Sequence, residues 1–293
     1  MRGSILLAVW IVTMTTCAAH SASAQIVTEN AGVVSPETPI LRESFTYLDG
    51  DHAREFRWSH QLILATDPSR EFRLTVPTSW KQVEFAGPGG QREEEELFGL
   101  GDLSLRFKQS LWQRDDVMES TRWAALAEVV APTGEDDERE GGAQIPRRLQ
   151  LGTGDWTLGA GSAFTVIRDR QRFSAEAYFR HRTPHEGTRF GQTIDLNLAW
   201  WCRIKPVQFA PDHDEIEVRG VLELLDTYRF SSQVGGRSAG DDGLLVWIAP
   251  GLQVYPSKTF LFEANVQVPV FQNIDDALGD RHVGATLVIK FLF

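Results

Sequence analysis

The sequence predicts an all-β protein: a transmembrane antiparallel up-and-down β-barrel of about twelve strands that follows an N-terminal signal peptide. Three features lead to this prediction. The first residues have the pattern of an export signal, and apolar and polar residues alternate in segment after segment of the remaining chain. Short turns and long loops also occur in alternation between these segments, as they do in outer-membrane barrels.

The N-terminus resembles a secretory signal in charge, apolar length and cleavage site. Arg2 supplies a positive charge, the apolar run Ile5–Met14 follows, and Ala22-Ser23-Ala24 has the small-x-small pattern of a cleavage site. The run is too short to cross ~30 Å of hydrocarbon as a helix. We therefore expect a signal peptide at 1–24, a periplasmic N-terminal segment at 25–38 and an outer-membrane β-barrel at 39–293.

Cysteine content and charge exclude other classes of protein. Cleavage of the signal removes Cys17 and leaves Cys202 as the single thiol, so no internal disulfide holds the mature chain. Loss of Arg2 moves the net charge from −11 to −12. Nucleic-acid binders carry basic patches, so this acidic balance disfavours a nucleic-acid partner.

The alternation of apolar and polar residues is clearest at the C-terminal end, where apolar side chains occupy every second position from Val283 to Phe293. The same pattern predicts strands near 55–66, 71–85, 100–114, 121–132, 154–168, 172–182, 192–206, 216–231, 244–256, 259–272 and 282–293. Single-chain bacterial barrels have an even number of strands, and 40–48 is the candidate for the additional strand. Long loops are expected at 86–99, 133–153, 183–191, 232–243 and 273–281.

Charged residues recur on the polar face of the strands, which a membrane barrel turns towards its lumen. The candidate lumen-lining residues are Asp102, Arg106, Lys108, Glu128, Glu176, Arg180, Asp195, Arg203, Arg219, Glu223, Glu263 and Lys290. The same register places Trp58, Trp80, Trp123, Trp156 and Trp200 on the apolar face and Trp112, Trp201 and Trp247 on the inner face. A soluble β-sheet is the alternative, because its strands also alternate.

Two resemblances add to this interpretation. The end of the chain, Lys290-Phe291-Leu292-Phe293, resembles the terminal signal of outer-membrane proteins, which implies that Phe291 and Phe293 are recognised by the barrel-assembly machinery. The chain also resembles outer-membrane transporters of the meta-pathway phenol-degradation family. The motifs that carry the second resemblance are Gly99-Leu100-Gly101-Asp102-Leu103-Ser104-Leu105, Ala131-Pro132-Thr133-Gly134, Leu151-Gly152-Thr153-Gly154-Asp155-Trp156 and Ala249-Pro250-Gly251-Leu252-Gln253. This resemblance implies a barrel that passes aromatic or hydrophobic compounds.

The remaining motifs favour no catalytic or metal site. No Gly-x-Ser-x-Gly elbow occurs, and no Gly-Lys-Ser/Thr phosphate cradle follows the glycines. His181 and His185 stand four residues apart, but Pro184 breaks the segment, so we read them as polar loop residues. The acidic turn 211–215 is read as a solvated turn. We therefore expect no metal and no cofactor.

The functional hypothesis is a barrel in the outer membrane of a Gram-negative bacterium that passes or binds small compounds, aromatic or hydrophobic ones among them, and that is not an enzyme. The expected partners are outer-membrane lipids, the barrel-assembly machinery and a small-molecule solute. Two alternatives stay open: a structural or adhesive barrel without conduction, and an outer-membrane lipid hydrolase.

Overall fold

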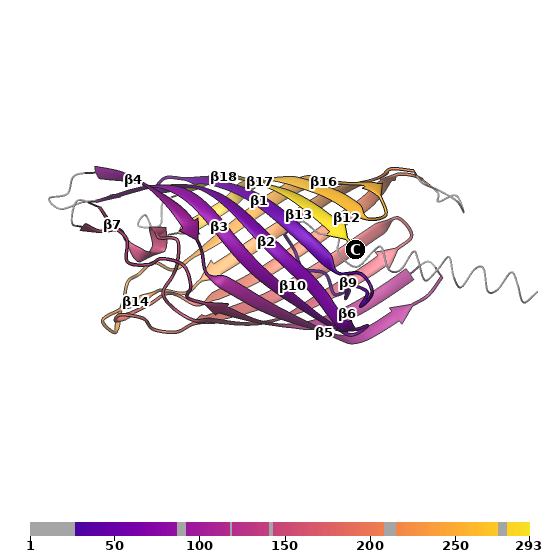
Figure 1. The fold of residues 1–293 in the computed structure, drawn as a ribbon, viewed down its shortest axis with the longest axis horizontal. Helices are drawn as coiled ribbons and strands as arrows, with labels where there is room; N and C mark the ends of the chain where they lie inside the picture. The colour runs from indigo at the N-terminus through magenta and orange to yellow at the C-terminus, as the bar shows by residue number, and fades with distance from the viewer. Residues whose placement is uncertain (1–26, 87–91, 118, 141–142, 208–214, 275–279) are drawn as a thin grey trace, which may run out of the picture.

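The computed structural model describes residues 27–86, 92–117, 119–140, 143–207, 215–274 and 280–293. The predicted signal peptide at 1–24 lies outside the described residues. Most of the described chain belongs to one antiparallel sheet, which closes on itself as a barrel (Figure 1). Closure follows from pairing of β1 (Ile40–Gly50) with β2 (Ala53–Asp67) on one side and with β18 (Arg281–Leu292) on the other.

Among the described residues this sheet has 13 strands, of which β4 and β5 pair with β3 one after the other, so the wall is 13 − 1 = 12 strands around. The remaining strands of the wall are β3 (Arg70–Ala86), β4 (Arg92–Leu100), β5 (Leu103–Asp115), β6 (Glu119–Ala131), β9 (Thr157–Arg168), β10 (Gln171–Arg182), β12 (Thr193–Lys205), β13 (Glu217–Arg229), β16 (Gly243–Ser257) and β17 (Phe260–Ile274). The predicted fold class is confirmed, and the additional strand expected at 40–48 is β1.

Side chains alternate between the two faces of the wall because the period of a β-strand is two residues. On β17, Val266 is 48% exposed on the outer face, whereas Glu263 and Gln267 are 1% and 8% exposed on the inner face. Exposed apolar side chains lie on the outside of the strands around the barrel. The barrel is therefore apolar outside and polar inside, the reverse of a soluble barrel.

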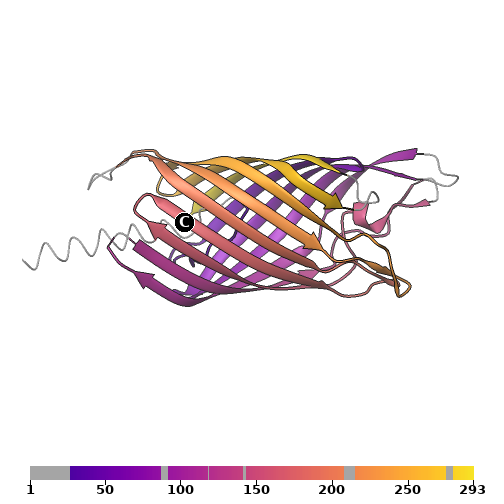
Figure 2. The same ribbon diagram turned by 180° about the vertical axis from the view of Figure 1, so that it is seen from behind.

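The two ends of the barrel differ in their connections (Figures 1 and 2). At one end, called the turn end, tight turns such as Asp169-Arg170 join neighbouring strands, and the C-terminus lies there. The other end, called the loop end, carries long connections. They contain β7 (Arg139–Glu140), β8 (Ala143–Gln144), the 3-10 helix η1 (Arg147–Leu149), β11 (Thr188–Arg189), β14 (Gln233–Val234) and β15 (Arg237–Ser238).

The connection at 132–156 folds back over the loop end. Its apolar side chains join those at the ends of β3 and β4 in one buried cluster, formed by Val83, Phe85, Leu97, Ile145, Leu149 and Leu151. Two glycines permit this fold. A Cβ on Gly152 would lie 2.2 Å from the Gly134 oxygen, and Gly154 has a φ of 69° that favours glycine.

Two sequence-based expectations are wrong. The loop expected at 86–99 is largely strand β4, which pairs with β3 beyond the apolar band. In its polar run, Glu94 and Glu96 are exposed, whereas Glu93 and Glu95 are half-buried on the face that they share with Leu97, so burial alternates although the residue type does not. Trp112, expected inside, is 47% exposed on the outer face opposite Trp123, because a register shift between Ser110 and Trp112 moves it across the wall.

Candidate functional site in the barrel lumen

The segment that precedes β1 lies inside the barrel. Five of its backbone N–H groups donate to inner side chains of four strands: Val27 and Thr28 to Glu223 Oε1 (3.1 and 2.8 Å), Glu29 to Glu176 Oε2 (3.0 Å), Ala31 to Thr165 Oγ1 (3.0 Å) and Val34 to Glu71 Oε2 (3.1 Å). These strands, β13, β10, β9 and β3, come from different parts of the wall, so the segment crosses the lumen. The sequence analysis expected a periplasmic segment at 25–38 and did not predict these contacts with the lumen.

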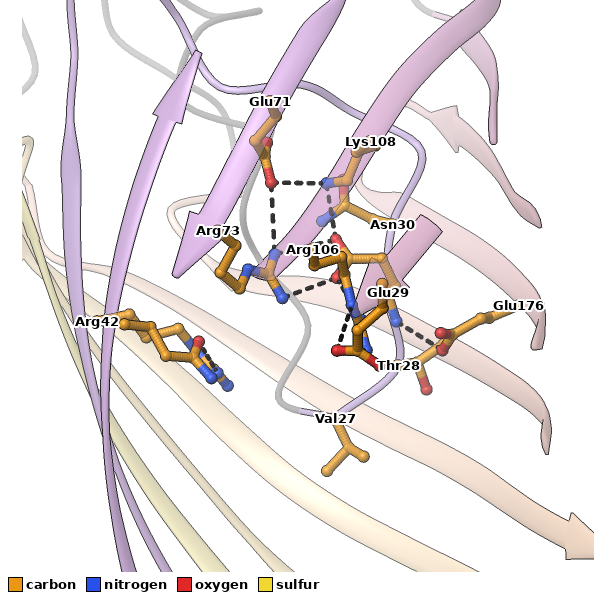
Figure 3. Close-up of polar contacts among 12 residues, drawn as sticks. Val27, Thr28, Glu29, Asn30, Arg42, Glu71, Arg73, Arg106, Lys108 and Glu176 are labelled. Carbon is orange, nitrogen blue, oxygen red and sulfur yellow. Dashed lines mark hydrogen bonds and ion pairs between the residues drawn. The ribbon is translucent and has the colours of Figure 1, made fainter. Parts of the chain in front are cut away.

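The side chain of Glu29 reaches three cations on the opposite side of the lumen (Figure 3). Its carboxylate lies 2.7 Å from Lys108 Nζ, 2.9 Å from Arg73 Nη1 and 3.3 Å from Arg106 Nη1. Glu29 is 6% exposed and Lys108 2% exposed, so water screens these contacts little. Lys108 also donates to the backbone oxygen of Gly32 at 3.0 Å. Lys108 therefore contacts the segment at two residues, Glu29 and Gly32.

Other carboxylates extend this cluster across the barrel. Glu71 lies 3.2 Å from Lys108, and Glu128 lies 3.1 Å from Arg106 and 3.6 Å from Arg180. Arg180 in turn pairs with Asp195. The central charge network is thus Glu29, Glu71, Glu128 and Asp195 with Arg73, Arg106, Lys108 and Arg180, and its four negative charges match its four positive ones.

A second group of inner residues lies nearer the turn end. Lys290 Nζ lies 2.8 Å from the Glu263 carboxylate, and both residues are buried. The guanidinium of Arg219 donates to the Tyr255 hydroxyl at 2.8 Å and lies 4.5 Å from the centre of the Trp201 ring. Cation–π contact of this kind favours an Arg in a desolvated site.

The structure places the predicted lumen-lining residues of the strands on the inner face: Arg106, Lys108, Glu128, Glu176, Arg180, Asp195, Arg203, Arg219, Glu223, Glu263 and Lys290. Asp102 has a different place. It lies between β4 and β5 at the loop end, where its carboxylate accepts hydrogen bonds from the N–H groups of Gly134 and Thr153 at 3.0 and 2.9 Å. Asp102 therefore anchors the 132–156 connection.

Sequence reasoning missed three members of the central charge network: Glu29, Glu71 and Arg73. The signal for two of them was present, because Glu71 and Arg73 alternate with Phe72 and Leu74 in a predicted strand. Glu29 lies in a segment without periodicity, so no pattern distinguished it.

The predicted assembly signal, Phe291 and Phe293, lies at the end of the last strand. Phe291 lies on the outer face of β18, its ring centre 4.9 Å from that of Phe260, and Phe293 is 70% exposed. Their recognition by the assembly machinery stays a prediction.

The two histidines of the sequence analysis have ordinary polar partners. His181 hydrogen-bonds to Gln192 and His185 pairs with Asp136 at 3.3 Å. Within the described part of the chain, no group of three potential metal ligands comes together. No helix among these residues is long and apolar enough to span a membrane.

These features define the class of protein. A closed antiparallel barrel with an apolar outer face, charged interior and tryptophans such as Trp58, Trp156 and Trp200 exposed on the outside is a transmembrane β-barrel of the bacterial outer membrane. In this class the turn end faces the periplasm and the loop end faces the exterior. The alternative of a soluble β-sheet would leave this outer face exposed to water.

The comparison with family models identifies the family. The family described as "Putative MetA-pathway of phenol degradation" matches residues 47–215, more than half of the 293-residue chain. The chain belongs to this family. No curated protein matches it significantly.

One solved structure shows the same fold, and two others are less similar. An outer membrane channel from Pseudomonas putida F1 matches with a TM-score of 0.71 at 10% identity, over 92% of this chain and 100% of that one. The β domain of the Bordetella autotransporter BrkA matches with a TM-score of 0.46 at 12% identity, over 90% and 100% of the two chains. The porin NanC matches with a TM-score of 0.45 at 11% identity, over 86% and 98%.

Proposed function

We propose that the barrel passes small compounds, aromatic or hydrophobic ones among them, across the outer membrane, and that it does so without chemical conversion. The observation that supports this most is a polar, charged lumen enclosed by a twelve-stranded wall. Family membership agrees with the proposed solute class through the phenol-degradation description.

The size of the barrel limits what passes. Twelve strands spaced ~4.8 Å apart and tilted by ~40° enclose a backbone cylinder of roughly 12 Å radius. Inward side chains and the segment at 27–38 occupy much of this width. The proposed solutes are therefore the size of a single ring or a short chain rather than oligosaccharides.

The segment inside the lumen also favours a second candidate function, a structural barrel without conduction. The segment is bonded to both sides of the lumen, through Glu223 on β13 and through Lys108 on β5. A barrel closed in this way passes solute only when the segment moves or leaves a path beside it.

Liposome swelling distinguishes the two functions. Liposomes that contain the full mature barrel are diluted into phenol, catechol, glycerol or sucrose, and protein-free liposomes give the background rate. We expect swelling above background with phenol and catechol and less with sucrose. Background rates for every solute, also after deletion of residues 27–35, would support the structural barrel and contradict passage.

A further inference from the structure

We propose that Arg73, Arg106 and Lys108 form an anion subsite in the lumen that takes a small carboxylate, and that Glu29 occupies this subsite in the present structure. The inference rests on the proposed passage of small solutes and specifies one solute class, aromatic acids with a free carboxylate. In this proposal the N-terminal segment is an internal ligand, because its Glu29 carboxylate occupies the position that a solute carboxylate would take.

The first argument is the geometry around the Glu29 carboxylate. Arg73 uses two N–H groups for its two oxygens, at 2.9 and 3.2 Å, which is the paired arrangement that makes Arg selective for carboxylates. Lys108 contacts one of these oxygens at 2.7 Å and Arg106 the other at 3.3 Å. Three cations of two neighbouring strands thus hold one carboxylate (Figure 3).

The second argument is charge balance. With Glu29 in place, the central charge network has four carboxylates for four cations. Without Glu29, three carboxylates remain for four cations. A buried cation that lacks its counterion is costly, so the vacated position attracts an anion.

The third argument concerns which carboxylate can be exchanged. Glu71, Glu128 and Asp195 belong to strands of the closed wall and keep their places as long as the barrel is folded. Glu29 is carried by a segment outside the strands. Its backbone N–H donates to Glu176 on β10, and the neighbouring Thr28 donates to Glu223 on β13, so the carboxylates on that side of the lumen are occupied by donors of the segment. The cations face Glu29 from β3 and β5.

Calorimetric titration of the detergent-solubilised full mature barrel tests the subsite without requiring passage. Benzoate is the probe, and benzyl alcohol, which has the same ring without the charge, is the neutral reference. The variants are Glu29→Gln, which removes the charge and keeps the shape, and Glu37→Gln, an exposed glutamate of the same segment, as matched control. A variant without residues 27–33 removes both carboxylate and backbone.

We expect Glu29→Gln and the deletion to bind benzoate at least about tenfold more tightly than the wild type and the Glu37→Gln control, because benzoate no longer competes with an internal carboxylate. Both variants should bind benzyl alcohol much more weakly than they bind benzoate, because benzyl alcohol carries no charge. Addition of Arg73→Gln to Glu29→Gln should abolish the gain. Glu29→Gln and the deletion are both compared with the wild type by heat-modifiable gel mobility, which reports a folded barrel.

Failure of the subsite and failure of passage give different results. If neither folded variant binds benzoate more tightly than the wild type, or if benzyl alcohol binds equally well, the anion subsite is overturned whatever the swelling rates show. If benzoate binds as expected while every swelling rate stays at background, the subsite stands and the proposed passage fails.

Discussion

Glu223, in the middle of β13, accepts a hydrogen bond of 2.8 Å from the backbone N–H of Thr28, 195 positions earlier in the chain. The same carboxylate oxygen accepts the N–H of Val27 at 3.1 Å, and the other accepts the side chain of Asn265 at 3.1 Å. Glu223 is fully buried. One inward residue of the wall therefore binds two consecutive backbone N–H groups of the N-terminal segment.

Replacement of Glu223 by Gln should loosen the segment without unfolding the barrel. Hydrogen bonds to a charged acceptor contribute about 1.5–3 kcal/mol, and a neutral amide oxygen recovers only part of this. We expect faster hydrogen exchange at the Thr28 amide and unchanged membrane insertion. Glu119→Gln, at the exposed turn end, is the control. Unchanged exchange at Thr28 in the Glu223 variant would show that the segment is held by other contacts.

A charge introduced on the outer face, unlike a change at Glu223 on the inner face, should reduce insertion into the membrane. Leu198 is 53% exposed on the outer side of β12. Leu198→Lys should cost about 2–4 kcal/mol near the bilayer midplane and reduce the inserted fraction, whereas Leu198→Ile should leave it unchanged. The inserted fraction is measured by protection from protease in proteoliposomes. Normal insertion of Leu198→Lys would contradict the assignment of the outer face.

Asp102 should control the 132–156 connection. Its carboxylate accepts the N–H of Gly134, and the N–H and hydroxyl of Thr153 at 2.9 and 2.8 Å. Asp102→Ala removes all these bonds, and we expect faster external proteolysis within 133–153 of the inserted barrel. Asp137→Ala, an exposed aspartate of the same connection, is the matched control. Equal cleavage rates in both variants would exclude Asp102 as the anchor.

The turn between β1 and β2 should respond to acid. The backbone N–H of Asp280, which donates to Asp51 at 2.8 Å, holds the pKa of the Asp51 carboxyl below its usual value of 3.8, and a hydrogen bond from His282 acts in the same direction. A carboxyl with a lowered pKa stabilises the folded turn above its ordinary pKa, and this contribution disappears as the pH falls through the lowered value.

We therefore expect the protection factor of the Asp280 amide against hydrogen exchange to be constant at neutral pH and to fall only below pH 3.8. The Asp51→Asn variant lacks the titrating group and should show no such fall. The hydrogen bond to Asp49 raises the pKa of His282, so a contribution of His282 would instead be lost as the pH rises above 6.5, and a loss of protection in that direction would point to His282 rather than to Asp51.

The wall of the barrel could be predicted because lipid outside and a polar lumen inside impose a strict period of two. That constraint located Arg106 and Glu263 on the inner face from sequence alone. It does not apply beyond the apolar band, where β4 forms with four successive glutamates, and it fails at the register shift before Trp112.

The central charge network was predictable only in part. The strand pattern indicates that Lys108 faces inward, but not which carboxylate it meets, because the Glu29 contact depends on closure of the barrel around a segment without periodicity. Long-range contacts of this kind leave no local signal. Only the three-dimensional structure shows that the Glu29 carboxylate meets Arg73, Arg106 and Lys108.

Planar-bilayer recording with and without residues 27–35 tests the central claim most directly. The barrel wall should persist in the deletion variant, because residues 27–35 belong to no strand. We predict a severalfold higher single-channel conductance and faster uptake of small solutes than in the wild type, since the deletion removes the segment that crosses the lumen. Equal, low conductance in both proteins, with both barrels inserted, would contradict a lumen that passes solutes and is restricted by this segment.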